Sequence, residues 1–289
     1  MDLDWLRANP RQLSIFLNHQ RIRVTPVPGG DVCVATRLTL DDGSELFAKQ
    51  RPVMPPADFF AAEAAGLRWL TVPGGPALPE VIAVDAQGIA LQWVEHGTPS
   101  VAAAEEFGRR LATLHRAPCP DFGAEWQGYI GTEPLDNTPS GGGAWLDWYR
   151  TRRIEPYLRT SRDADALTSA DVAMVEAALA RIDQPVEPPA RIHGDLHPGN
   201  LLWGRDRAWL VDPAAHGGHR ETDLATLRLF GGIAQLDRVV AAYQDIYPLA
   251  AGWEERVGVH QLHLALVHTA LFGPGFAGLV RAASDHTTC

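Results

Sequence analysis

The chain has very little cysteine. Only Cys33, Cys119 and Cys289 are cysteines among 289 residues, an odd number without the spacing of a metal-ligand motif. A disulfide framework is therefore not expected, and a reducing, cytoplasmic compartment fits best. The chain also lacks a basic run: 25 Lys and Arg stand against 35 Asp and Glu, for a net charge of −10. Nucleic acid is therefore not an expected partner.

Long hydrophobic runs are missing as well. No stretch reaches the roughly 18 uninterrupted apolar residues of a membrane span, so no membrane association is expected. The N-terminus, Met-Asp-Leu-Asp-Trp-Leu-Arg, is charged where a signal peptide would be apolar. With 46% hydrophobic residues the composition is that of a globular protein, and 289 residues are near the upper limit for one core. Two lobes are therefore plausible.

The pattern of apolar residues changes along the chain. Residues 1–96 predict a helix at 4–19, a second helix at 59–70, and strands at 21–26, 32–40, 45–50, 81–84 and 89–94. Later residues predict a loop at 126–143, short strands at 201–203 and 208–211, and helices at 105–115, 144–158, 169–181, 222–230, 236–246 and 253–272. We therefore expect an α+β, bilobal chain: a small antiparallel sheet lobe over 1–96 and a larger, mostly helical lobe over 97–289.

The residues richest in chemistry form the stretch Arg191-Ile-His-Gly-Asp-Leu-His-Pro-Gly-Asn200, with Asp212 just beyond the next predicted hairpin. Asp195 would face an acceptor hydroxyl as catalytic base, whereas Asn200 and Asp212 offer the hard oxygen ligands that Mg²⁺ prefers. This is the layout of a phosphotransferase with a protein-kinase-like fold, which uses ATP and Mg²⁺. One Asp in a turn needs no explanation, but three polar residues straddling a hairpin in this way favour function.

The N-terminal lobe offers candidate nucleotide contacts. Lys49 ends a predicted strand and Glu63 lies one turn into the next helix, so a Lys–Glu pair could hold the ammonium on the ATP phosphates. Gly29 and Gly30 lie between the first two strands, where glycine lets backbone N–H groups approach phosphate. Glu95 and His96 follow the last strand of the lobe, and their backbone would bind adenine.

The stretch His193–Asn200 resembles the catalytic loop of aminoglycoside phosphotransferases and choline kinases. Val211–Ala225, which contains Gly-His-Arg-Glu-Thr-Asp-Leu-Ala, and the later Leu229-Phe-Gly-Gly232 resemble the fructosamine kinase (ketosamine kinase) family more specifically. The resemblance implies Asp195 as base, Asn200 and Asp212 on magnesium, and Lys49 on ATP. It also implies a ketosamine acceptor, free or protein-bound, that is phosphorylated on its sugar 3-hydroxyl as a repair of early glycation.

The resemblance leaves some details of the acceptor and the assembly open. Family members often carry Trp-Ser where this chain has His197-Pro198, so His197 is a candidate acceptor contact that also suits an antibiotic or amino-alcohol kinase. Glu221 is a candidate contact for the substrate amine. We expect a monomer. Because some relatives carry a redox-active cysteine near the position of Cys33, a redox-linked dimer through Cys33 is the alternative, beside a buried strand thiol.

Two readings from other classes remain. His193, Asp195 and His197 alternate and could ligate the metal of a hydrolase, although that reading leaves Lys49 and Asp212 unexplained. A non-catalytic pseudokinase would be expected to have lost Lys49, Asp195, Asn200 or Asp212, and all four are present. His260, His263 and His268 could also bind a metal, but buried or surface histidines without one are the more common case.

Overall fold

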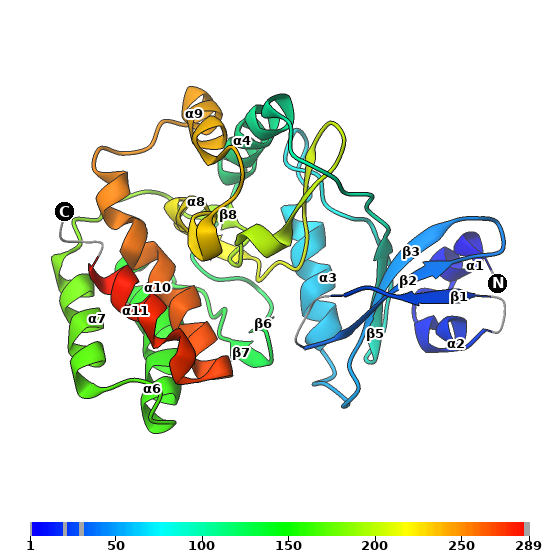
Figure 1. Ribbon diagram of the computed structural model, residues 1–289, viewed down its shortest axis with the longest axis horizontal. Coiled ribbons are helices and arrows are strands. Elements are labelled where there is room, and N and C mark those ends of the chain that lie inside the picture. Colours follow the sequence, from blue (N-terminus) through cyan, green and yellow to red (C-terminus); the bar gives the residue numbers. More distant parts are fainter. Residues whose placement is uncertain (1, 20–21, 29–31, 286–289) are drawn as a thin grey trace.

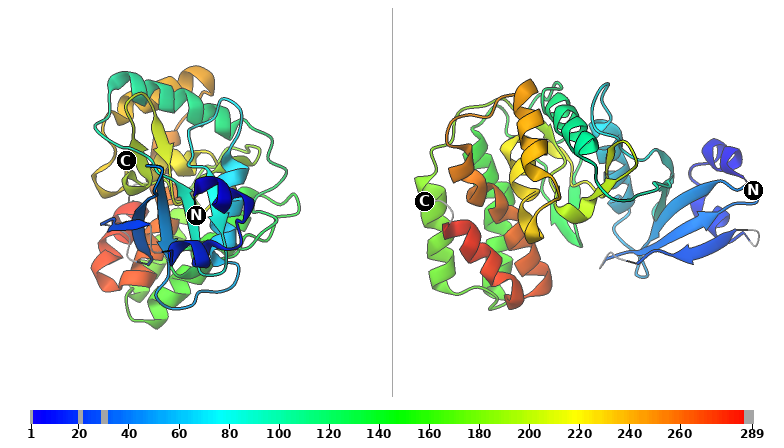
Figure 2. Two further views of the ribbon diagram at one scale, coloured as in Figure 1. Left: turned by 90° about the vertical axis from the view of Figure 1, so that its right-hand side faces the viewer. Right: turned by 45° about the horizontal axis from the view of Figure 1, so that its top comes forward.

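The computed structural model describes residues 2–19, 22–28 and 32–285 and has two lobes (Figures 1 and 2). The smaller lobe contains a five-stranded antiparallel sheet in the order β1-β2-β3-β5-β4. Its strands are β1 Arg23–Pro26, β2 Val34–Thr39, β3 Glu45–Gln50, β4 Val81–Val84 and β5 Gly88–Gln92. The predicted α+β, bilobal fold is confirmed, with the sheet in the N-terminal part of the chain.

Strand β3 illustrates how the sequence builds this sheet. Successive side chains of a strand point to opposite faces. Leu46 and Ala48 join a buried cluster with the first helices, whereas Phe47 packs against the cluster around the third helix, α3. Lys49 has the same alternation as Phe47 and therefore points to the α3 side of the sheet. Register is thus fixed by burial, since a slip of one residue would expose Leu46 and Ala48.

The opening helix predicted at 4–19 is wrong in one respect, because it is two helices. Helix α1 spans Leu3–Ala8 and α2 spans Leu13–Leu17. Between them lies Pro10, which has no N–H to donate inside a helix. Asp2 accepts a hydrogen bond from the Trp5 backbone N–H at 2.8 Å and so caps α1. Both helices cover the face of the sheet opposite α3.

Helix α3, Phe59–Leu70, lies between the sheet and the larger lobe (Figure 1). Phe59, Phe60 and Leu67 pack under the sheet with Ile89 and Leu91 of β5. On the other side the helix closely approaches the larger lobe at Gly66. A Cβ added at Gly66 would lie 3.1 Å from the Ala215 Cβ, so a small residue is needed there. This contact holds Glu63 of α3 over the junction of the lobes.

The larger lobe is mostly helical. Its long helix α10, Trp253–Phe272, packs against α8, α6 and α11, while α4 and α9 pack against each other. The α-helices of this lobe are α4 Val101–His115, α5 Trp145–Tyr149, α6 Glu155–Asp163, α7 Ser169–Arg181, α8 Glu221–Thr226, α9 Leu236–Ile246, α10 and α11 Ala277–Asp285, with a π-helical segment Arg150–Ile154 joining α5 to α6. No helix in the described ranges is long and apolar enough to cross a membrane.

Several predicted boundaries in this lobe need correction. The predicted loop 126–143 contains a hairpin of β6 Gly128–Ile130 and β7 Glu133–Leu135. The strands β8 Ala190–Ile192 and β11 His216–Gly218 pair with each other, and neither was predicted. The predicted helix 222–230 is also too long: α8 ends at Thr226, and Phe230 has a left-handed φ of 53°. Strands β9 Leu201–Trp203 and β10 Ala208–Leu210 form the predicted hairpin.

Candidate active site

The catalytic-loop candidates lie between two short strand pairs. Strand β8 leads into the loop at His193, and a 3₁₀ turn, Pro198–Asn200, leads out of it into β9. Inside the loop the Asn200 side-chain amide donates to the Asp195 backbone carbonyl at 2.8 Å and to its Oδ2 at 3.1 Å. These two bonds fix the carboxylate of Asp195 relative to Asn200, the proposed metal ligand.

Asp212 lies beside this loop, two residues after the end of β10. The Val211 backbone N–H donates to the Asn200 carbonyl at 3.1 Å, which ties the two segments together. Asp212 has φ 55°, a left-handed conformation that is uncommon outside glycine and is concentrated at functional sites. The sequence-distant carboxylates of Asp195 and Asp212 therefore face one site.

The predicted Lys49–Glu63 pair is present. The Lys49 Nζ donates to Glu63 Oε1 at 3.0 Å, and it also forms an ion pair with Asp212. Lys49 is only 8% exposed. Burial disfavours its ammonium, but the carboxylates of Asp212 and Glu63 outweigh that cost and hold the pKa of Lys49 above its usual range. One buried cation thus joins the sheet, α3 and the larger lobe.

Asp195, Asn200, Asp212, Lys49 and Glu63 line one cleft of about 630 Å³ between the lobes. That volume is in the range of small-molecule sites. Burial raises the pKa of the Asp195 carboxyl to about 8, and the nearby Asp212 charge adds to the effect, while the Asn200 amide opposes it. A carboxyl group with a raised pKa in a cleft is a typical candidate for an acid or base.

The candidate adenine contacts lie only partly in the cleft. His96 lines the cleft together with Leu91, Trp93 and Val94. The Glu95 side chain is 74% exposed and accepts hydrogen bonds from Trp93 Nε1 at 2.9 Å and from Arg37 at 3.2 Å. The Glu95 side chain does not line the cleft, so only its backbone remains a candidate contact. Gly29 and Gly30 lie outside the described residues.

His197 lies next to Asp195 in the same cleft. Its Nε2 is 3.9 Å from Asp195 Oδ1, and its Nδ1 accepts the Gly199 backbone N–H at 3.0 Å. Burial lowers the pKa of His197 to about 4, with His268 contributing in the same direction, so the imidazole is neutral near pH 7. A neutral ring beside the proposed base suits an acceptor contact.

The contacts of His193 contradict the metallohydrolase hypothesis. The His193 Nε2 bonds the Val211 carbonyl at 2.9 Å, and its Nδ1 accepts the Asp195 backbone N–H at 3.3 Å. Both ring nitrogens of His193 are therefore engaged. Within residues 2–19, 22–28 and 32–285, the group of metal-type ligands that comes together is a different one: His219, Glu221 and His260.

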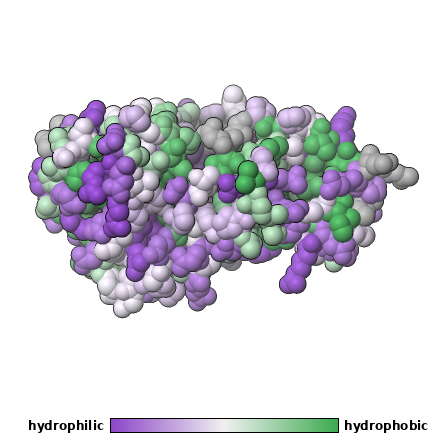
Figure 3. All heavy atoms as spheres, turned by 90° about the horizontal axis from the view of Figure 1, so that it is seen from below, coloured by the Kyte–Doolittle hydropathy of each residue, from purple (hydrophilic) through white to green (hydrophobic). Residues whose placement is uncertain are grey.

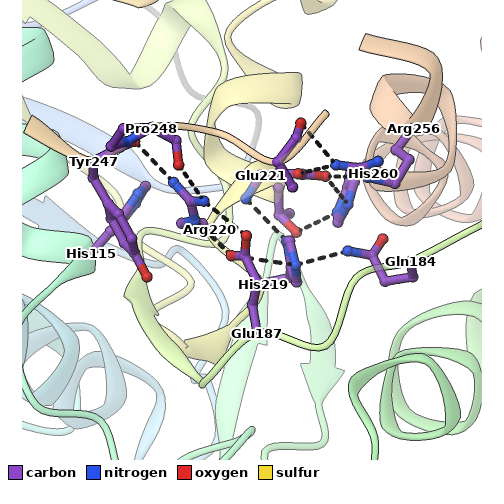
Figure 4. A network of polar contacts seen from close by, with 12 residues as sticks. His115, Gln184, Glu187, His219, Arg220, Glu221, Tyr247, Pro248, Arg256 and His260 are labelled. Atoms are coloured by element: carbon purple, nitrogen blue, oxygen red, sulfur yellow. Dashed lines mark hydrogen bonds and ion pairs between the residues drawn. The ribbon is translucent and has the colours of Figure 1, made fainter. Parts of the chain in front are cut away.

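The assignment of Glu221 to a substrate contact is contradicted by its position. Glu221 is 1% exposed and receives two hydrogen bonds from Arg256, at 2.8 and 2.6 Å (Figure 4). Burial alone would raise the pKa of Glu221, but the bonds from Arg256 and His260 lower it to about 2. The guanidinium of Arg256 already supplies the positive charge that a metal would bring to this group. Glu221 is thus part of a buried network inside the lobe, away from the cleft.

Asp223, two residues later, is the functional residue that the sequence pattern did not reveal. Its fully buried carboxylate accepts the backbone N–H groups of His193 at 2.7 Å and Gly194 at 3.0 Å. Its Oδ2 also lies 3.2 Å from His115 Nε2. Asp223 therefore anchors the start of the catalytic loop to α8. An Asp before Leu-Ala reads equally well as a helix cap, so only packing distinguishes the two roles.

Cys33 lines the cleft and is half-buried, and burial raises the pKa of its thiol. A thiol with a raised pKa is a poor nucleophile near neutral pH. The redox dimer through Cys33 stays a prediction.

Comparisons with known proteins give the family. The sequence model of the fructosamine kinase family matches residues 11–286. A probable ketoamine kinase from Thermus thermophilus is 34% identical over 260 residues, covering 90% of this chain and 92% of that protein. The crystal structure of a candidate fructosamine-3-kinase from Thermobifida fusca has a TM-score of 0.86 and 45% identity, covering 92% of this chain and 93% of that one.

More distant structures share only the fold. An aminoglycoside phosphotransferase superposes with a TM-score of 0.64 at 16% identity, covering 96% of this chain and 99% of its own. That likeness agrees with a protein-kinase-like, bilobal architecture.

Proposed function

Because this chain belongs to the fructosamine kinase family, we propose that it transfers the γ-phosphoryl group of ATP to a hydroxyl of a ketosamine. The observation that carries the proposal is the single cleft into which Lys49, Glu63, Asp195, Asn200 and Asp212 converge. Phosphoryl transfer depends mainly on positioning and on neutralising charge, and each of these residues serves one of those ends. Residues 1–96 would hold the nucleotide, and residues 97–289 the catalytic groups and the acceptor.

The proposed roles follow from the contacts. Asp195 accepts the proton of the acceptor hydroxyl, because the Asn200 amide holds its carboxylate in the cleft. Lys49, held by Glu63, binds the α- and β-phosphates of ATP. The backbone of Glu95 and His96 binds adenine, while Gly29 and Gly30, outside the described residues, stay a prediction from the sequence.

Magnesium fits the residues that would hold it. Asn200 uses its amide nitrogen on Asp195, so its amide oxygen remains for a cation. Asp212 supplies a carboxylate oxygen beside it, and oxygen donors of this kind suit Mg²⁺. When bound, the ion would neutralise charge on the β- and γ-phosphates.

The acceptor is tested by measuring ATP consumption with fructosamines, ribulosamines, an aminoglycoside and choline. We expect turnover of ketosamines. Brisk turnover of the aminoglycoside or choline without any ketosamine would instead favour the antibiotic or amino-alcohol kinase, for which His197 in the cleft is the supporting observation.

The base is tested with Asp195→Ala, which should remove nearly all turnover while leaving ATP binding largely intact. A matched control is Asp206→Ala, because Asp206 is exposed in the turn between β9 and β10 and does not line the cleft. Retained activity in Asp195→Ala would refute the assigned base.

A further inference from the structure

Four aromatic side chains form a connected group, and two of them, His268 and Phe272, line the cleft. His268 and Phe272 belong to α10, Phe276 follows in a 3₁₀ turn, and Phe230 comes from the segment after α8. The His268 ring centroid lies 4.9 Å from that of Phe230, 5.7 Å from Phe272 and 5.6 Å from Phe276. Phe272 and Phe276 are 5.5 Å apart. We call Phe230, His268, Phe272 and Phe276 the aromatic group.

Two members of the aromatic group are exposed. Phe230 is 46% and Phe272 44% exposed, although burying a phenyl ring is favourable. On the face seen from below, hydrophobic surface interrupts the hydrophilic cover between the lobes (Figure 3). Phe230 also has φ 53° and ψ 37°, a left-handed conformation that is costly for a bulky residue and is retained mainly at functional sites. The fold thus exposes the apolar ring of Phe230 to water, at a cost in free energy.

The aromatic group is close to the proposed base. Phe230 meets the His197 ring edge-on at 5.6 Å, and the His197 Nε2 lies 3.9 Å from Asp195 Oδ1. His268 and Phe272 line the same cleft as Asp195. In a ketosamine, four bonds of about 1.5 Å separate the 3-hydroxyl oxygen from the amine, so the two atoms are at most about 5 Å apart. An acceptor whose hydroxyl sits at Asp195 therefore keeps its amine within the cleft that His268 and Phe272 line.

The charges in the cleft leave the amine without a carboxylate of its own. The carboxylates that line the cleft in the described part of the chain are Glu63, Asp195 and Asp212, and the proposed function assigns all three to the nucleotide, the metal and the hydroxyl. Glu221, the carboxylate that the sequence suggested, is buried against Arg256. An aromatic face attracts a cation through its quadrupole and repels an anion.

We propose that the aromatic group is the subsite for the amine end of the acceptor, so that the enzyme prefers ketosamines of aromatic or apolar amines over those of carboxylated amines. This inference rests on the proposed ketosamine kinase activity. The protonated amine lies against the rings, and its substituent packs on Phe272 and Phe230. A carboxylate on the substituent, as in an amino-acid adduct, would meet the negative faces of the same rings.

The test compares two acceptors with the same sugar: the fructose adduct of benzylamine and the fructose adduct of glycine. The wild-type enzyme should have a lower KM for the benzylamine adduct. Phe272→Ala and Phe230→Ala should each raise that KM by about two- to fivefold, the effect of losing one exposed cation–aromatic contact, with a smaller change for the glycine adduct. Phe272→Leu keeps an apolar side chain but no π face, so it should restore only part of the affinity.

Ile246→Ala is the matched control, because Ile246 is a similarly exposed apolar residue on α9 that does not line the cleft. Its KM values should equal those of the wild type. If ketosamines are phosphorylated but the two adducts have equal KM values, or the phenylalanine variants leave both unchanged, the aromatic subsite is refuted while the kinase activity stands. If the wild type phosphorylates neither adduct nor any other ketosamine, the proposed function and the subsite fall together.

Discussion

Replacing Asp223 by Asn should show what the anchoring of the catalytic loop, His193–Asn200, contributes to stability and turnover. The substitution leaves the proposed catalytic groups themselves unchanged. Asp223 Oδ1 accepts the Gly194 N–H at 3.0 Å, and Oδ2 accepts the His193 N–H at 2.7 Å. An asparagine keeps one acceptor oxygen but turns an NH₂ group towards the other N–H. One charge-assisted hydrogen bond is lost and one buried donor is left without an acceptor.

The magnitude follows from those two losses. A hydrogen bond to a charged group contributes about 1.5–3 kcal/mol, and an unsatisfied buried donor costs about 1–3 kcal/mol. Because the two losses occur at neighbouring groups and are not strictly additive, we expect the free energy of unfolding to fall by about 2–5 kcal/mol. A displaced loop also moves Asp195, and a misplacement of about 1 Å can lower turnover roughly 100-fold.

The assay measures urea unfolding, nucleotide binding and kcat under conditions in which the variant is folded. Asp171→Asn is the matched control: Asp171 is another buried carboxylate, which caps α7 through Thr168 and pairs with Arg281 at 2.6 Å, but it does not line the cleft. We expect Asp171→Asn to lose stability but to keep its kcat. If Asp223→Asn kept the wild-type kcat, or if both variants lost kcat equally, the anchoring role would be wrong.

Three further predictions concern the Lys49 cation, the helix contact at Gly108 and the buried histidines. Lys49→Met should lower kcat about 100-fold, because the phosphates lose one preorganised cation. Single-turnover measurements of phosphoryl transfer test this. Gly108→Ala should lower the free energy of unfolding by about 1–3 kcal/mol, because the added Cβ would collide with the Val239 carbonyl of α9, and an unchanged Tm would contradict that packing. Burial lowers the pKa of six histidines, so these side chains bind more protons in the unfolded chain than in the folded one below pH 6.5. The raised pKa values of Asp195 and Glu63 act in the opposite direction, but they are two groups against six. Stability should therefore fall from pH 6.5 towards the lower pKa values of the folded state, and a urea midpoint that stays flat would exclude this; the histidines are His193, His197, His216, His219, His260 and His263.

The sequence predicted best those features that depend on local patterns. Alternation of apolar residues identified the strands of the sheet and placed Lys49 at the end of one of them. The Gly/Pro-rich loop from His193 to Asn200 could be interpreted because its chemistry lies within a few residues. Strands β6, β7, β8 and β11 have three residues each, too few for alternation to show. Strands β9 and β10 are equally short, but the Gly204–Arg207 turn between them marks them in the sequence. The break at Pro10 is a local feature as well, because proline has no N–H to donate inside a helix.

Glu221 and Asp223 show why part of the site could not be predicted. In a helix each residue is rotated by about 100° from the one before it, so residues two apart point to different sides. Glu221 faces Arg256 of α10, whereas Asp223 faces the catalytic loop. The sequence shows two carboxylates in one short helix. Which of them faces the loop depends on how α8 packs between α10 and β8, and that is a tertiary property.

Chemistry and acceptor recognition occupy different parts of this chain. The groups proposed to transfer the phosphoryl group come from β3, α3, the catalytic loop and Asp212, whereas the aromatic group comes from α10 and the segments beside it. His197 is where the two meet, because it contacts Asp195 on one side and Phe230 on the other. A substitution in α10 can therefore change which amine is accepted without moving Asp195. Relatives that keep the catalytic loop but differ at Phe230, Phe272 or Phe276 should then differ in acceptor preference while sharing one reaction.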